Sequence, residues 1–349
     1  MAAFAFATCQ VGAEGALKAE VKREAPSLRP AFMRPGFVTF KSDAPLAPTF
    51  ALELVFARAL AVSLGKADDT DVVARVVDLA HARGPVRLHA WMRADHDDDD
   101  AIDPHAPADA LVARILGAEG ARGAFLDGPA ALPGDVVLDV VGVDPGVWYL
   151  GKHVHGPWAS PFPGGDPRLA VPGAAPSRAW AKIEQGLRFA DVPIRAGDRV
   201  VEIGASPGGV THALLARGCD VIAIDPAEMD PRVLSSPHLR HVRAPVGDVT
   251  ASSIARPVRY IVLDVNISPF AALRQIEAMV HEHAPDLFGL LLTLKLGEWH
   301  MARRVPHLLS IVKKLGAPTA EVRAKQLPAN KVEIFVAALT PAGVARRSG

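Results

Sequence analysis

The feature that most constrains the fold is the segment 200–225, VVEIGASPGGVTHALLARGCDVIAID. It joins a hydrophobic run, a glycine-rich turn, a helical stretch and a second hydrophobic run that ends in an acid. Continuous apolar runs separated by helical patterns are typical of parallel strands that are buried on both faces. In such sheets ligands bind at the carboxyl ends of the strands. The turn at 204–209 is therefore the predicted ligand site.

The residues of this turn decide between kinds of nucleotide site. A phosphate-binding loop needs a lysine after its last glycine, whereas Val210 and Thr211 follow Gly209, which excludes that ATPase motif. A dinucleotide fingerprint needs a glycine at position 206, where this sequence has Ser206, and Pro207 stiffens the turn. A dinucleotide site is therefore disfavoured. The remaining pattern is E-x-G-x-x-P-G-G, in which the backbone can approach an uncharged or zwitterionic ligand closely.

The same alternation of strands and helices continues to the end of the chain. It predicts a doubly wound α/β domain, a Rossmann-like arrangement. The predicted strands are 199–203, 220–224, 260–264, 288–295 and 331–338, and the predicted helices are 177–189, 208–217, 270–283 and 299–315.

The first part of the chain follows a different pattern. Residues 1–150 contain short strands at 37–40, 86–92 and 136–143 and helical stretches at 14–25 and 70–84, which predicts an α+β region, either undivided or in two parts, 1–42 and 43–150. Residues 151–176 are rich in proline and glycine and are predicted to be a linker. The α/β domain is expected over residues 177–340.

Charge differs between these two parts although the whole chain is formally neutral. Residues 151–349 carry 24 Lys and Arg against 17 Asp and Glu, a formal charge of +7, and residues 1–150 carry −7. A basic second half suits an anionic substrate, although the excess of positive charge is modest.

No apolar run reaches the length of about 20 residues that spans a bilayer, so we expect a soluble, cytoplasmic protein. Cys9 and Cys219 each lie in an apolar run, which favours two buried thiols over a disulfide.

Two clusters of possible metal ligands are weak candidates. His153 and His155 point the same way on an extended segment and have no evident third ligand, so we expect no metal there. The acidic run Asp95, Asp97, Asp98, Asp99 and Asp100 lacks the glycine and terminal glutamate of a calcium loop, and it is best interpreted as a solvated loop.

The segments EIGASPGG, DPAEMDPRV and VGDV together resemble the FtsJ-like ribose 2′-O-methyltransferases, which use S-adenosylmethionine (SAM). The resemblance implies that Asp225 lies near the ribose of SAM, as its place at a strand end also suggests, and that Asp248 lies near the adenine. The residues implied at the methionine end, together with the acid on the strand, are Glu202, Gly204, Ser206, Pro207, Gly208 and Gly209.

The resemblance also implies that the last strand of the sheet is antiparallel. It extends to the Lys-Asp-Lys-Glu tetrad of that family. SRAWAKIEQ supplies Lys182, VLDVNISP supplies Asp264, LLLTLKLGEW supplies Lys295 and NKVEIFVA supplies Glu333. Asp264 is also counted with the cofactor-binding residues. Lys182 could instead be a solvent-facing helix residue and Glu333 an exposed strand residue. Our hypothesis is that Lys295 is the general base for a ribose hydroxyl, that Asp264 and Lys182 orient and tune it, and that Glu333 aligns the substrate or Lys182.

Outside the catalytic half, segments such as MRPGFVTFK and WYLGKHVHGPW look like the bacterial family that methylates a cytidine ribose in large-subunit ribosomal RNA (rRNA). This likeness implies an RNA partner and a THUMP-like RNA-binding region before the methyltransferase domain. Two alternatives stay open: a non-catalytic RNA-binding or assembly protein, and an oxidoreductase with a degenerate loop. Candidate contacts to RNA are Arg29, Arg34, Arg168, Arg178, Arg303, Arg304, Lys325 and Lys331.

Overall fold

The computed structural model describes residues 3–47, 49–94 and 103–347, so the predicted acidic loop at 95–100 lies outside the described residues. The chain divides into two compact units, Met1–Pro167 and Arg168–Gly349. Each unit contains one seven-stranded sheet. They are described in turn, beginning with the unit that contains the glycine-rich turn.

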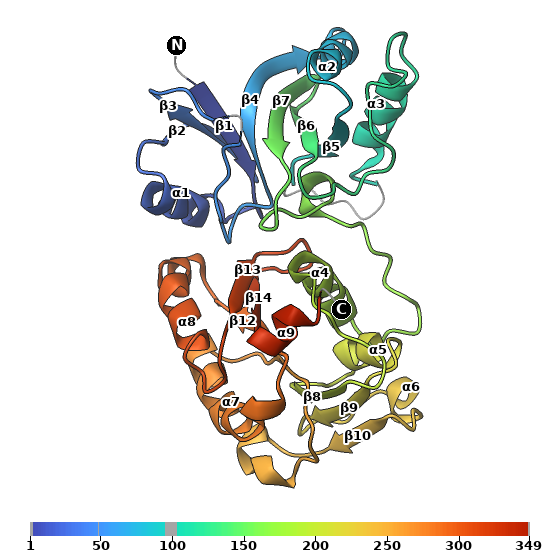
Figure 1. The fold of residues 1–349 in the computed structure, drawn as a ribbon, viewed down its shortest axis with the longest axis vertical. Helices are drawn as coiled ribbons and strands as arrows, with labels where there is room; N and C mark the ends of the chain where they lie inside the picture. The colour runs from blue at the N-terminus through green and yellow to red at the C-terminus, as the bar shows by residue number, and fades with distance from the viewer. Residues whose placement is uncertain (1–2, 48, 95–102, 348–349) are drawn as a thin grey trace. The chain divides into compact units, whose positions relative to one another are not determined.

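The second unit is built on a mostly parallel sheet (Figure 1). Its strand order is β10-β9-β8-β11-β12-β14-β13, so the order reverses direction between β8 and β11, beside the glycine-rich turn. β14 is antiparallel to β12 and to β13, as predicted for the last strand. The strands are β8 (Arg199–Ile203), β9 (Asp220–Ile224), β10 (Leu239–Val242), β11 (Tyr260–Asp264), β12 (Gly289–Lys295), β13 (Glu321–Lys325) and β14 (Glu333–Leu339).

Helices cover this sheet on both sides (Figure 1). α4 and α5 pack through Ile183, Leu187 and Leu214 onto one face, while α7 and α8 lie together on the other. The helices are α4 (Ala179–Ala190), α5 (Gly209–Leu215), α6 (Pro231–Leu234), α7 (Pro269–His283), α8 (Val305–Val312) and α9 (Pro341–Ala345), with 3₁₀ turns η2 (Val246–Asp248), η3 (Ala251–Ser253), η4 (Ala284–Asp286) and η5 (Trp299–Arg304). The predicted doubly wound α/β fold is confirmed.

Some details of this unit differ from the sequence prediction. The single helix expected at 299–315 is the turn η5 followed by α8, because Pro306 stands at the start of α8 and cannot continue a preceding helix. β10 and β13 were not predicted. β10 has four residues, and β13 reads EVRAK with four half-buried positions, so neither has the apolar run that marked the other strands.

The first unit has one mixed sheet in the order β2-β3-β1-β4-β7-β6-β5. Since β1 pairs with β4, residues 1–42 and 43–150 share this sheet and do not form two separate sheets. β7 continues to Val154 and so enters the segment predicted as a linker, where its pairing with β6 outweighs the local glycine. The strands are β1 (Ala3–Thr8), β2 (Arg29–Arg34), β3 (Phe37–Ser42), β4 (Ala59–Asp68), β5 (Arg87–Met92), β6 (Val136–Asp144) and β7 (Val147–Val154).

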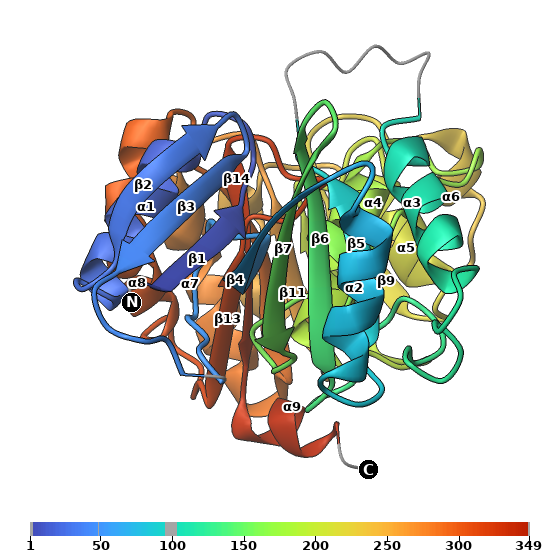
Figure 2. The ribbon, with the colours of Figure 1, turned by 90° about the horizontal axis from the view of Figure 1, so that it is seen from above.

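The helices of the first unit are α1 (Glu14–Glu24), α2 (Val72–His81) and α3 (Ala106–Leu116), with a 3₁₀ turn η1 (Pro163–Gly165). α2 and α3 pack on the β5–β6 end of the sheet (Figure 2), where Val76 and Leu111 meet Leu88 and Val140. Cys9 and Cys219 are buried free thiols, as predicted. Every helix among the described residues is too short or too polar to cross a membrane.

Candidate active site

Four charged side chains meet where α4, β11, β12 and β14 come together. Lys295 Nζ lies 2.8 Å from Asp264 Oδ1 and also donates to Glu333 Oε2. Lys182 Nζ lies 2.7 Å from Glu333 Oε1 and 3.6 Å from Asp264 Oδ2. The structure therefore brings together the four tetrad residues that the sequence spreads over 152 positions. Two ammoniums alternate with two carboxylates, and each carboxylate faces both amines.

Local structure explains how each member reaches this position. The register of the sheet pairs Lys295 directly with Glu333, and Asp264 is the last residue of the neighbouring strand. Lys182 comes from α4, whose residues Ile183 and Leu187 are buried in the core below. Its side chain is 20% exposed and that of Glu333 is 7% exposed, so neither is the solvent-facing residue that the sequence left open.

Burial and ion pairing act against each other on the charged states. Burial lowers the pKa of the Lys295 ammonium, but the carboxylates of Asp264 and Glu333 raise it more, and the resulting pKa lies above that of an ordinary lysine. Burial raises the pKa of Glu333, but Lys182 and Lys295 lower it more, and the net shift is downward. Lys295 and Glu333 therefore both stay charged at neutral pH.

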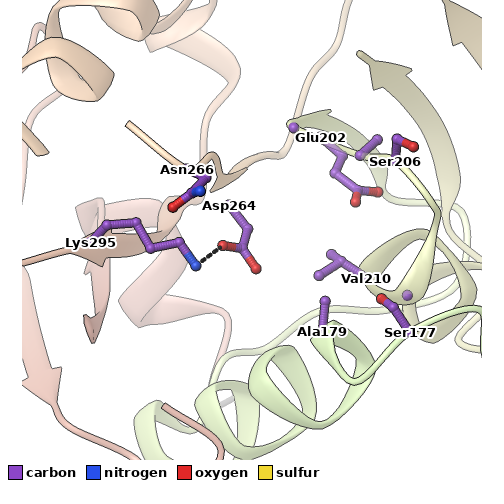
Figure 3. A pocket seen from close by; sticks show the side chains of 11 residues that line it. Ser177, Ala179, Glu202, Ser206, Val210, Asp264, Asn266 and Lys295 are labelled. Atoms are coloured by element: carbon purple, nitrogen blue, oxygen red, sulfur yellow. Dashed lines mark ion pairs between the residues drawn. The ribbon is translucent and has the colours of Figure 1, made fainter. Parts of the chain in front are cut away.

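A pocket adjoins this cluster at the carboxyl ends of β8 and β11 (Figure 3). Lys295 and Asp264 line one side, and residues of the glycine-rich turn line the other. Gly204 has φ +80°, and a Cβ there would lie 2.5 Å from the carbonyl oxygen of Asp264. Any side chain at this position would press into β11, so the absence of one permits the close approach of the two strand ends. The lining residues are Ser177, Ala179, Glu202, Gly204, Ala205, Ser206, Gly209, Val210, Asp264, Asn266 and Lys295.

Glu202 is a buried carboxyl group of this pocket. It is 2% exposed and accepts a hydrogen bond of 2.6 Å from the hydroxyl of Thr211. Burial raises the pKa of Glu202 to about 8, against the lowering effect of that hydrogen bond. The side chain is therefore mainly protonated at neutral pH, and an added positive charge in the pocket would favour its ionised form.

The acids at the next strand ends have different surroundings. Asp225 Oδ2 accepts a hydrogen bond of 3.0 Å from the backbone N–H of Ser206, and Oδ1 accepts one of 2.8 Å from Ala227. Asp225 thereby holds the turn, although it is not among the lining residues. Asp248 is exposed in η2 and does not line the pocket. Pro207 and Gly208 complete the turn, and Gly208 caps α5 with φ +115°.

Some lining residues were not singled out from the sequence. The hydroxyl oxygen of Ser177 is buried and has no hydrogen-bond partner among the described residues. Asn266, exposed beside Lys295, follows Asp264 by two positions (Figure 3). Both lie in the segments that supplied tetrad residues, SRAWAKIEQ and VLDVNISP, so proximity to a predicted site residue was the available signal.

The candidate RNA contacts divide by exposure. Arg178, Arg303, Arg304 and Lys331 are exposed. The prediction for Lys325 is wrong, because this side chain is 6% exposed and lies 5.5 Å from the centre of the Phe189 ring, out of reach of a surface phosphate.

The remaining predictions concern the first unit and metals. Arg29 and Arg34 are exposed, but each forms an ion pair, with Asp43 and Asp144 respectively, so their charges are partly neutralised. No group of three or more His, Cys, Asp or Glu able to hold a metal ion occurs among the described residues.

Comparison with known proteins identifies the class of the second unit and then the family of the chain. Residues 175–326 match the family described as "FtsJ-like methyltransferase", so this unit contains an FtsJ-like methyltransferase domain. A protein of Aromatoleum aromaticum named "Ribosomal RNA large subunit methyltransferase M" is 30% identical over 75% of both chains. One of the same name from Xanthomonas axonopodis pv. citri is 28% identical over 95% of this chain and 97% of its own.

A third relative of that name, from Marinobacter nauticus, is 38% identical, and the chain spans 32% of its length in that alignment. The chain belongs to the ribosomal RNA large subunit methyltransferase M family.

Proposed function

We propose that this protein is a SAM-dependent RNA ribose 2′-O-methyltransferase that acts on a cytidine of large-subunit rRNA. The observation that carries the proposal is the meeting of Lys182, Asp264, Lys295 and Glu333 beside a pocket lined by the glycine-rich turn. The relatives' printed names support ribosomal RNA as the substrate.

The residues of the pocket fit SAM. Gly204 and Gly209 of the turn line the pocket, which suits a zwitterionic methionine end, and the unpartnered Ser177 hydroxyl can donate a hydrogen bond to its carboxylate. Asp225, by analogy with ribose-binding acids at the end of the second strand, would accept from the ribose hydroxyls. We assign the adenine to the side of Asp248. When bound, SAM supplies an electrophilic methyl group and a positive charge.

In the proposed reaction a ribose 2′-oxygen attacks the methyl carbon, the carbon–sulfur bond breaks to leave S-adenosylhomocysteine (SAH), and the hydroxyl proton passes to Lys295. A ribose hydroxyl is a poor nucleophile, so alignment and proton removal are the tasks left to the protein. Lys295 can accept the proton only when neutral, and its raised pKa means that deprotonation precedes the step. Asp264 and Lys182 orient and tune Lys295, and Glu333 aligns Lys182.

The first unit is proposed to be the THUMP-like RNA-binding region. Its single mixed sheet with helices agrees with an α+β RNA-binding module. Because its charge is negative overall, recognition there would depend on RNA shape and on local basic residues such as Arg29 and Arg34.

The decisive experiment uses SAM labelled in its methyl group and rRNA from cells that lack the gene. We expect the wild type to transfer the label to ribose 2′-oxygens and Lys295→Ala to lose a factor of about 10³ in kcat while its Kd for SAH stays within about twofold. Lys295→Arg is the matched variant, since it keeps the positive charge but cannot become neutral, and it should be equally inactive. Near-normal turnover by either variant would contradict the role of Lys295, and no transfer by the wild type would contradict the function itself.

A further inference from the structure

A second group of side chains follows Asp264 and Lys295 closely in sequence, and the proposed reaction does not use it. Phe270, Arg304 and His307 form this group, which we call the shelf. The Arg304 guanidinium lies over the Phe270 ring, 5.2 Å from its centre, and the centres of the Phe270 and His307 rings are 5.8 Å apart. Arg304 and His307 are exposed and Phe270 is half-buried. Three flat groups therefore gather at the surface where α7 and α8 begin and η5 ends.

The shelf is continuous in sequence with the active-site pocket on both sides. Phe270 stands four residues after Asn266, which lines the pocket beside Lys295 (Figure 3). η5, which ends at Arg304, begins four residues after Lys295. Both connections leave the carboxyl ends of neighbouring parallel strands, β11 and β12, which place their following segments on the same edge of the sheet.

Arg304 differs from other arginines that lie over aromatic rings in the partners of its guanidinium group. Arg34 also pairs with Asp144, Arg346 with Asp198, and Arg259 donates to the carbonyl oxygen of Asp286. Those arginines have acceptors within the protein. Within the described residues no ion pair or hydrogen bond holds the guanidinium of Arg304, so its donors remain available to a ligand.

An exposed guanidinium stacked on an aromatic ring is suited to an unstacked nucleic-acid base. RNA bases bind to aromatic rings and to guanidinium planes, and the free N–H groups of the arginine can reach the adjoining phosphate. Around the shelf, Arg303 adds a further exposed positive charge. The chemistry of the shelf therefore matches a single-stranded nucleotide.

On the basis of the proposed function, we infer that the shelf binds the nucleotide next to the one that is methylated. The base stacks on Arg304 and Phe270, and this contact holds the neighbouring ribose hydroxyl at Lys295. Such stacking changes the affinity for RNA and leaves the binding of SAM unchanged, since no shelf residue lines the cofactor pocket.

The test is methyl transfer by full-length variants to deproteinised rRNA from cells that lack the gene. Arg304→Gln removes the charge and Phe270→Leu removes the π-face, and each should raise KM for RNA about tenfold, with kcat and the Kd for SAH within about twofold of wild type. Phe270→Tyr, which keeps an aromatic face, should retain a nearly normal KM. Arg240→Gln on edge strand β10 also removes one exposed positive charge and should behave as wild type.

An unchanged KM in Arg304→Gln or in Phe270→Leu overturns the inference, and a change in Arg304→Gln alone would identify a phosphate contact without stacking. A KM for Arg240→Gln that rises as much as that of Arg304→Gln also overturns it, because the effect would then come from net charge. If the wild type itself transfers no methyl group, the proposed function fails and the inference fails with it.

Discussion

The two units each bury a cluster of ionisable side chains, but they do so with different balances of charge. In the second unit two lysines face two carboxylates. In the first unit three histidines, His89, His153 and His155, gather beside Asp139, which lies 2.6 Å from His153 Nδ1. The Asp135 carboxylate also acts on His155. Among the described residues no partner is found for Asp139 Oδ1, His153 Nε2 or His155 Nδ1, although all three atoms are buried.

This difference decides which groups keep their charge. Burial lowers the pKa of His89 to about 4 and also lowers that of His155, so both rings are neutral at pH 7. Burial lowers the pKa of His153 as well, but the Asp139 carboxylate raises it more, and the net shift is upward. The comparison shows that burial neutralises a group unless close opposite charges outweigh it, as the paired carboxylates do for Lys295 and the paired lysines do for Glu333.

The largest effect is expected when the balance in the second unit is broken. Glu333→Gln keeps the shape of the side chain but leaves two ammoniums facing one carboxylate. We expect kcat to fall about a thousandfold because the alignment of both lysines is lost, with the Kd for SAH nearly unchanged. The pKa of Lys295 should fall, because Glu333 raises it, so the rising limb of the pH–rate profile should move to lower pH. A limb that does not move, or kcat within threefold of wild type, would show that Glu333 does not act on Lys295.

The sequence was sufficient for the parts of this site that combine a marked apolar strand with a terminal charge. Asp264 and Lys295 end runs of buried residues, so both the strands and the position of the charges could be predicted. Lys182 and Glu333 were ambiguous, because a charged residue in an amphipathic helix or an alternating strand is equally typical of the surface. Only the register of β12 with β14 places Glu333 opposite Lys295.

The cluster in the first unit could not be predicted in this way. His153 lies in a segment that the sequence assigned to a linker, and it joins the sheet because β7 pairs with β6. His89 and Asp139 are paired across β5 and β6 although 49 positions separate them in the chain. Long-range pairing of strands, which local patterns do not encode, therefore created this cluster.

Glu202 allows the comparison to be tested within the second unit. Among the described residues this buried carboxyl group accepts a hydrogen bond from a hydroxyl and forms no ion pair. Glu202 has a folded-state pKa of about 8 against an ordinary 4.5, so the folded protein retains a proton that the unfolded chain releases, and stability falls as pH rises through this window. Between pH 5 and 7.5 we expect a loss of about 3 kcal/mol that Glu202→Gln does not show. Urea denaturation at several pH values measures it. Glu277→Gln, at an exposed position of α7, should follow the wild type, and equal slopes for all three proteins would refute a neutral Glu202.

The histidine cluster should give the opposite sign and a smaller effect. His89 has a folded-state pKa of about 4 against 6.5, so the unfolded chain binds a proton first on acidification, and stability is lost as pH falls from 6.5 towards 4. Between pH 6.5 and 5 the loss is expected to be about 2 kcal/mol. His89→Gln can still donate to the carbonyl oxygen of Pro129 but cannot gain a proton, so it should lose less stability. His81→Gln is the matched control, because His81 also contacts a backbone carbonyl, that of Gly120, but is exposed on α2. If His89→Gln and His81→Gln change the acid slope equally, burial is not what keeps His89 neutral, and the contrast between the two units fails.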